Sequence, residues 1–201
     1  MTTAVIQALE AQRDVAAVAA TLREVTVGVH TASDRRAGEG AGVIWHPDGL
    51  VVTNAHCIRH RHVGLRTADG RSVDAEVVAQ DRRLDLALLS SPALRGRAPD
   101  LGDVDALRPG ELLVAFGHPL GVRGALTLGV LYAVARDARS GDPRWICADV
   151  RLAPGNSGGP LADAAGRIVG INTMVAGGLG LAIPTPVVRR FVERVRPALA
   201  A

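Results

Sequence analysis

Hydrophobic and polar residues follow two different periods along this chain. In residues 3–25 the apolar positions recur at three- and four-residue steps, which predicts a helix with one apolar face. From residue 25 onward the apolar residues fall in short runs, often alternating with polar ones, as is typical of strands. These runs lie at 25–29, 42–45, 50–53, 63–67, 72–79, 84–89, 111–116, 126–134, 145–150, 159–162, 168–174 and 180–183.

The spacing of these runs predicts two small antiparallel barrels with a helix at each end of the chain. Turns rich in Gly and Pro separate neighbouring runs, and a stretch dense in Pro, Gly and charge interrupts the pattern at 91–110. Thr185 as a cap and Pro186 in the first turn predict a final helix. We therefore expect an all-β fold. Its parts are an N-terminal helical segment at 1–24, a first barrel at 25–97, a linker at 98–110, a second barrel at 111–184 and a C-terminal helix at 185–197.

Composition narrows the chemistry that this fold can perform. All 23 basic residues are Arg, which excludes Schiff-base chemistry, a phosphate-loop lysine and Ser-Lys dyads. The net charge of +3 is small and the arginines are scattered, so we expect no nucleic-acid partner. Cys57 and Cys147 form neither a disulfide framework nor a Cys-x-x-Cys zinc site, and we expect two free thiols.

No targeting or membrane signal is evident in the sequence. The N-terminal residues lack the basic start and continuous apolar run of a signal peptide, and no stretch has the length needed to cross a bilayer. We expect no membrane partner and a cytoplasmic location for the chain as given. A periplasmic or secreted location is expected instead if a signal has been removed.

The sequence GNSGGP at 155–160 is the strongest chemical signal. A nucleophilic serine needs small neighbours and a tight loop whose N–H groups converge on a developing oxyanion. Ser157 is the candidate nucleophile. Gly155, Asn156 and Ser157 form the candidate oxyanion hole, with the N–H groups of Gly155 and Ser157 as its two donors. A flexible turn is the plainer interpretation of a serine among glycines.

A candidate base and its orienting acid precede this motif. His56 lies in TNAHC, directly after an apolar strand and beside a small residue, which leaves room for a serine hydroxyl. Asp85 lies in the apolar run DLALL, where a carboxylate is costly without a partner, and orienting His56 would offset that cost. Asp81 is a poorer choice because it sits in a polar turn.

Histidine spacing also raises a metal-binding interpretation. His56, His60 and His62 are close in sequence, but no glutamate base accompanies them, and the last two lie in an Arg-rich turn. We expect no metal and no cofactor.

Together, TNAHC, DLALL and GNSGGP resemble the three signatures of trypsin-like serine proteases. The flanking segments GAGVIWHPDGLVVTNAHCI, ELLVAFGHPLG, APGNSGGPLADAAGRIVGINT and GLGLAIPTPVV resemble the protease domain of the HtrA/Deg family over about residues 25 to 195. The resemblance implies a chymotrypsin-like double β-barrel and a serine endopeptidase that cleaves unfolded or exposed protein segments without a cofactor.

The resemblance also implies a substrate pocket and an assembly. Leu152, Thr173, Met174 and Val175 would line a primary pocket for a small or medium aliphatic side chain, while Arg151 either favours an acidic side chain or faces solvent. The family commonly forms trimers, so a homotrimer is expected. Its members usually carry PDZ domains and a long loop between the first two strands. We expect neither here.

Two other functions are compatible with parts of the pattern. A catalytically silent or chaperone-like relative would bind protein segments in the same cleft, and an activated-serine probe would distinguish it. An esterase for small acyl substrates is the second alternative. That activity is usually found in folds with a parallel sheet and alternating helices, and this pattern lacks such an alternation.

Overall fold

Two closed six-stranded barrels make up the body of the protein. The computed structural model describes residues 3–31 and 40–199. The strands of the first barrel run in the order β1-β2-β3-β6-β5-β4, with every pair antiparallel. Their bounds are β1 (Thr26–Thr31), β2 (Gly40–His46), β3 (Leu50–Thr53), β4 (His62–Arg66), β5 (Ser72–Asp81) and β6 (Leu86–Ser90).

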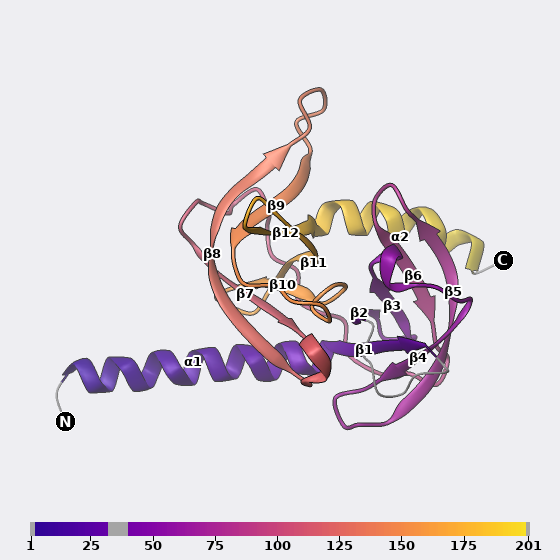
Figure 1. Ribbon diagram of the computed structural model, residues 1–201, viewed down its shortest axis with the longest axis horizontal. Coiled ribbons are helices and arrows are strands. Elements are labelled where there is room, and N and C mark those ends of the chain that lie inside the picture. The colour runs from indigo at the N-terminus through magenta and orange to yellow at the C-terminus, as the bar shows by residue number, and fades with distance from the viewer. Residues whose placement is uncertain (1–2, 32–39, 200–201) are drawn as a thin grey trace.

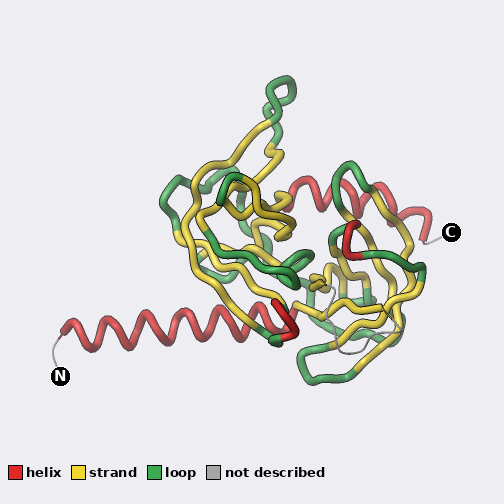
Figure 2. The backbone as a smooth tube through the Cα atoms, viewed as in Figure 1, coloured by secondary structure: helices red, strands yellow, loops and turns green. Residues whose placement is uncertain are grey.

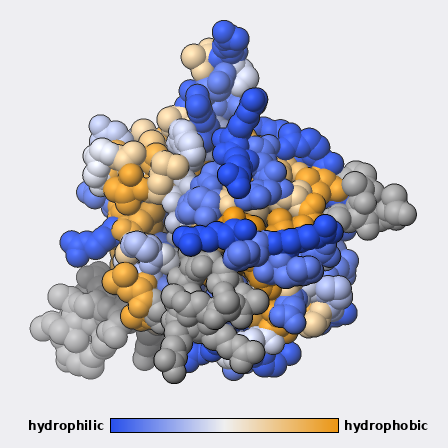
Figure 3. Space-filling view, turned by 45° about the vertical axis from the view of Figure 1, so that its right-hand side comes forward, coloured by the Kyte–Doolittle hydropathy of each residue, from blue (hydrophilic) through white to orange (hydrophobic). Residues whose placement is uncertain are grey.

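The second barrel repeats the topology of the first. Its strands run in the order β7-β8-β9-β12-β11-β10 and again close through antiparallel pairs. Their bounds are β7 (Leu112–Gly117), β8 (Ala125–Arg136), β9 (Pro143–Asp149), β10 (Pro160–Asp163), β11 (Ile168–Ala176) and β12 (Leu179–Pro184). The β8–β9 hairpin rises above the rest of the barrel, and its exposed tip is mostly hydrophilic (Figures 1 and 3).

Three apolar clusters hold the barrels together and to each other. One cluster fills the first barrel and another fills the second. The third contains side chains from both barrels, such as Leu88 of β6 and Phe116 of β7, together with residues of the two terminal helices. Because this shared cluster lies between the barrels, it fixes the position of one barrel against the other.

The two helices differ in how they join this core. In α1 (Thr3–Val25), Val18, Leu22 and Val25 are buried in the shared cluster at the C-terminal end, while the rest of the helix projects away from the body (Figures 1 and 2). By contrast, α2 (Thr185–Leu199) lies along the body and packs Val188 and Phe191 into the same cluster.

This architecture confirms the predicted all-β double barrel with terminal helices, with one local correction. The predicted strand at 84–89 is shorter: β6 begins at Leu86, and Asp85 lies in the preceding turn with a left-handed φ of 55°. The apolar pattern begins at residue 84, before the backbone enters the sheet at Leu86, so the pattern does not mark the start of the strand. The short segment between the first two strands lies largely outside the described residues. Among the described residues, no helix is long and apolar enough to span a membrane.

We predict that Phe191→Ala lowers the free energy of unfolding by about 3–5 kcal/mol, because it opens a cavity where α2 meets both barrels. The exposed Arg189 on the same helix offers a matched control, and Arg189→Ala should change stability by less than about 0.5 kcal/mol. Urea unfolding of the two variants measures both values. Equal, small effects would show that α2 is not part of the cooperative core.

Candidate active site

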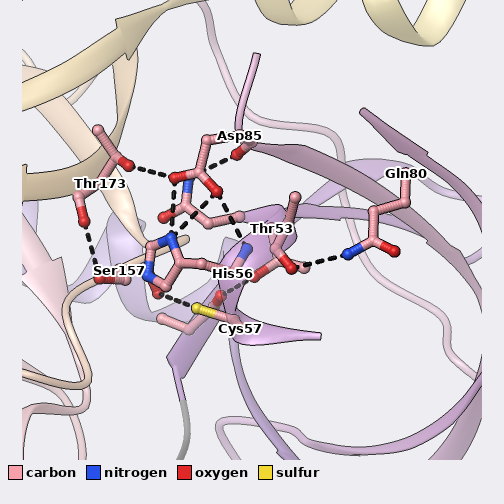
Figure 4. A network of polar contacts seen from close by, with 10 residues as sticks. Thr53, His56, Cys57, Gln80, Asp85, Ser157 and Thr173 are labelled. Carbon is pink, nitrogen blue, oxygen red and sulfur yellow. Dashed lines mark hydrogen bonds and ion pairs between the residues drawn. The ribbon is translucent and has the colours of Figure 1, made fainter. Parts of the chain in front are cut away.

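The candidate site lies where the two barrels meet. His56 belongs to a short 3-10 turn, η1 (Ala55–Cys57), that follows β3, and Asp85 precedes β6. Ser157 lies in the loop before β10, and Thr173 lies in β11 of the second barrel. The structure thus brings residues that are up to 117 positions apart into one network of polar contacts (Figure 4).

The Asp85 carboxylate is the centre of this network. Its Oδ2 accepts a hydrogen bond from His56 Nδ1 at 2.8 Å, and its Oδ1 accepts one from the His56 backbone N–H at 3.0 Å. The Thr173 hydroxyl donates to Oδ2 from the second barrel. Because an ionised carboxylate only accepts, the Nδ1 atom carries a proton and leaves Nε2 as the free ring nitrogen of the neutral imidazole.

The backbone around Asp85 supports its unusual conformation. A left-handed φ is uncommon for a residue with a side chain, although Asp tolerates it better than most. The Asp85 carbonyl accepts hydrogen bonds from the Ala55 N–H at 3.1 Å and from the Asn54 side-chain amide at 3.0 Å. These contacts tie the turn before β6 to the end of β3, and so place the carboxylate beneath His56.

Pairing changes the proton affinity of the two partners in opposite directions, since His56 binds its proton more tightly and Asp85 less tightly. The hydrogen bond from Asp85, with smaller help from Cys57, raises the pKa of His56 from 6.5 to about 10, against the opposing effect of burial. Burial would raise the pKa of Asp85, but the hydrogen bonds from His56 and Thr173 outweigh it and leave the pKa lowered. The pair therefore favours an ionised Asp85 and a charged His56 ring, and Nε2 can accept a proton only in the neutral form of that ring.

The loop that carries Ser157 requires its glycines. Gly155 and Gly158 have φ values of 103° and 82°, and a Cβ at Gly158 would lie 2.0 Å from the Ala41 carbonyl oxygen. Among the described residues, no acceptor takes the backbone N–H groups of Gly155 and Ser157, whereas the Asn156 N–H donates to Ala153 O at 2.9 Å. The Asn156 N–H is thus engaged within the loop, while the two N–H groups expected to act as donors, those of Gly155 and Ser157, point to no acceptor in the described chain.

The Ser157 hydroxyl rests on a backbone carbonyl. Its Oγ donates to Thr173 O at 3.0 Å, and no hydrogen bond joins it to His56 within the described chain. Thr173 therefore contacts both halves of the site, through its hydroxyl to Asp85 and through its carbonyl to Ser157. The sequence analysis assigned Thr173 only to a substrate pocket. The one available signal in the sequence was a pair of polar residues, Asn172 and Thr173, within an apolar run.

The other predicted pocket residues border the same region without joining the network. Leu152 is half-buried and would lie 3.1 Å from a Cβ built at Gly180. Met174 and Val175, which follow Thr173 along β11, are exposed, and so is Arg151. His60 and His62 are also exposed, and the described residues contain no group of three side chains arranged to hold a metal ion.

Cys57 completes the wall behind the site. It is buried and free, and its Sγ lies 3.9 Å from the Ser157 carbonyl oxygen. Gly40 faces it: a Cβ at that position would lie 2.7 Å from the Cys57 sulfur and 3.3 Å from its Cβ. The Ala41 N–H holds the Ser157 carbonyl at 2.8 Å, so β2 packs directly against the loop of the candidate nucleophile.

Comparisons with known proteins agree with this geometry. The family described as trypsin-like peptidase domain matches residues 40–171. The chain is 37% identical over 165 residues to serine protease HTRA1 of Xenopus laevis, covering 78% of this chain and 36% of that relative. It is 36% identical over 167 residues to mitochondrial serine protease HTRA2 of Drosophila ananassae, covering 79% of this chain and 39% of that relative.

A solved structure shows the same fold over most of the chain. The HtrA-type protease AlgW with a decapeptide superimposes with a TM-score of 0.79 at 26% identity, covering 90% of this chain and 66% of that one. The chain belongs to the trypsin-like peptidase domain family, and over that domain it is similar to HtrA-type serine proteases. It spans somewhat more than a third of the length of the curated relatives named above.

We predict that Asp85→Asn lowers the pKa of His56 from its raised value toward 6.5, because the negative acceptor that stabilises the charged ring is removed. An NMR titration of the His56 ring measures this shift without relying on activity. Asp81→Asn is a control, since Asp81 pairs with Arg194 and does not contact His56. An unchanged titration in Asp85→Asn would show that the pair does not set the basicity of His56.

Proposed function

We propose that this chain is a serine endopeptidase in which Ser157 is the nucleophile, His56 the general base and Asp85 the group that orients His56. The observation that carries the proposal is the Asp85 carboxylate, which fixes the His56 ring through Nδ1 and leaves Nε2 available as a base. The loop at Ser157 adds two unused N–H groups for an oxyanion. Similarity to HtrA-type serine proteases supports the same activity.

The proposed reaction proceeds by acyl transfer. Ser157 Oγ forms a bond to the carbonyl carbon of the scissile peptide while its proton passes to His56 Nε2. The Gly155 and Ser157 N–H groups stabilise the negative oxygen that develops. The C–N bond then breaks, and His56 returns the proton to the leaving amine. Water repeats the sequence on the acyl-enzyme and releases the acid product.

The resting contact of Ser157 suggests how substrate starts this cycle. The hydroxyl donates to the Thr173 carbonyl, which is also an acceptor that a substrate backbone N–H can take. A substrate bound in this way would displace the hydroxyl and free it to turn toward His56 Nε2. Hydrogen bonds of this kind are often incomplete before substrate binds.

The proposed substrates are unfolded or exposed segments of proteins. AlgW, to which this chain is similar, has been solved with bound peptides, which supports a peptide-binding site. Leu152, Met174 and Val175 beside Thr173 would favour a small or medium aliphatic side chain before the scissile bond. A silent, chaperone-like relative would keep the cleft without the chemistry, but the His56–Asp85 contact gives it no support.

We predict that Ser157→Ala lowers the cleavage rate of an unfolded protein such as casein by about 10⁴-fold or more, since the covalent route is lost. The fold should be unchanged, because no core side chain is altered. Ser140→Ala, at the exposed tip of the β8–β9 hairpin, should keep full activity. A fluorophosphonate probe should label the wild-type protein but not Ser157→Ala. A wild-type protein that the probe does not label would be a catalytically silent relative.

We also propose that the chain assembles as a homotrimer, with α1 contributing to the contact. Among the side chains that the structure describes, the helix packs Val18, Leu22 and Val25 at its C-terminal end into the core, and its backbone projects from the body (Figure 2). Light scattering on the whole chain should give a trimer, and removal of residues 1–13, which spares the buried Val18 and Leu22, should give a monomer. A monomer in both cases contradicts the assembly. A trimer in both removes α1 from the contact.

A further inference from the structure

A cavity of about 610 Å³ lies between the first barrel and the loop that follows β7. It is lined by the end of α1, by β1, by the turn between β4 and β5, and by the segment around the 3-10 turn η2 (Pro119–Gly121). We call it the arginine cavity, after Arg23, Arg66 and Arg123 in its wall. Gly28 in its floor has no side chain, and a Cβ there would project between Arg66 and His118.

Among its described lining residues, the arginine cavity carries more positive than negative charge. Seven arginines of the described chain pair with carboxylates, and Arg23, Arg66 and Arg123 are among the described arginines that do not. The nearest contact of Arg23 is the Ala68 carbonyl at 3.4 Å.

Among the described residues that line the cavity, Asp69 is the one acid, and it does not balance these charges. Asp69 is already engaged by Thr67 and by Arg71, the latter at 2.7 Å. Burial and the charges of Arg123 and Arg23 lower the pKa of His118, so the neutral form of this ring is favoured. Part of that lowering is caused by the positive charge of the cavity. A cluster of guanidinium groups without acids is suited to a carboxylate, with which Arg forms paired hydrogen bonds.

The arginine cavity adjoins the candidate active site on the side of His56. Gly40 lines the cavity and faces Cys57, the residue after His56. On the opposite wall, the His118 N–H donates to the Gly155 carbonyl at 3.0 Å, which ties the cavity to the proposed oxyanion loop. In acyl transfer the base hands its proton to the leaving amine, so the leaving segment of the substrate must pass His56.

We propose that the arginine cavity binds an acidic side chain in the substrate segment that follows the scissile bond. This proposal rests on the proposed protease function. Binding in the arginine cavity would make the enzyme selective for acidic residues after the scissile bond. The apolar residues near Thr173 would set the selectivity for the residue before the bond. A carboxylate two to four residues after the scissile bond would reach past Cys57 and Gly40 to the guanidinium groups, since extended chain spans about 3.3 Å per residue.

The test uses quenched fluorescent peptides that are identical before the scissile bond. They carry Glu, Gln or Arg at the second to fourth positions after it. The Glu peptide should have a kcat/KM about three- to tenfold above that of the Gln peptide, with the Arg peptide below both, and the differences should shrink in high salt. Equal rates for Glu and Gln peptides that are both cleaved would overturn the proposal.

Charge removal locates the effect. The double variant Arg66→Gln/Arg123→Gln should abolish the preference for Glu, so that the Glu and Gln peptides are cleaved with equal kcat/KM. Arg189→Gln removes a charge from α2, outside the arginine cavity, and should keep the preference. Loss of the preference in both would indicate a general charge effect and contradict the assignment.

Binding measurements separate this proposal from the protease function. Fluorescence anisotropy with Ser157→Ala should show tighter binding of the Glu peptide than the Gln peptide, and Arg66→Gln/Arg123→Gln should remove that difference. If no peptide is cleaved, the protease function fails, and the anisotropy result alone decides on the cavity. If inorganic phosphate speeds cleavage of Glu and Gln peptides equally, the cavity is a site for a free anion and the substrate proposal is wrong.

Discussion

The carboxylate of Asp85 joins the two barrels at the point where the proposed chemistry takes place. Its donors come from the His56 backbone and ring in the first barrel and from the Thr173 hydroxyl in the second. A half-buried carboxylate is costly without such donors. The network is therefore favoured only when the two barrels keep this position relative to each other. A shift of one barrel against the other would separate Thr173 from Asp85 before it disturbed either barrel's own hydrogen bonds.

Packing keeps that register. The shared apolar cluster holds residues of both barrels and of both helices, so the relative position of His56 and Ser157 depends on a core as well as on polar contacts. The Ala41 N–H bound to the Ser157 carbonyl adds a second link across the same boundary. Rigid elements therefore position the reactive groups, and the glycine-rich loop supplies the backbone shape that they need.

Much of the fold and of the candidate site could be predicted from the sequence, because both depend on local patterns. Alternating apolar runs predict the strands, and the small residues around Ser157 predict a tight loop. That Asp85 lies in a turn rather than in a strand could not be predicted, since the apolar run of β6 begins before the backbone enters the sheet.

Other features depend on contacts that no local pattern encodes. The two roles of Thr173 and the use of the Asn156 N–H by Ala153 arise only when the chain is folded. The arginine cavity gathers residues from α1, β4 and the segment after β7, which appear in the sequence as scattered surface charge.

The absence of a side chain at Gly40 bears on redox chemistry. The gap between a Cβ built at Gly40 and the Cys57 Cβ, 3.3 Å, is slightly below the usual span of a disulfide. With glycine there, the described chain places no second thiol against Cys57, and hydrogen bonds rather than a covalent bond hold β2 to the loop of Ser157. The geometry of the candidate nucleophile therefore does not depend on a disulfide in the described chain, and a single codon change at Gly40 would offer Cys57 a partner for one.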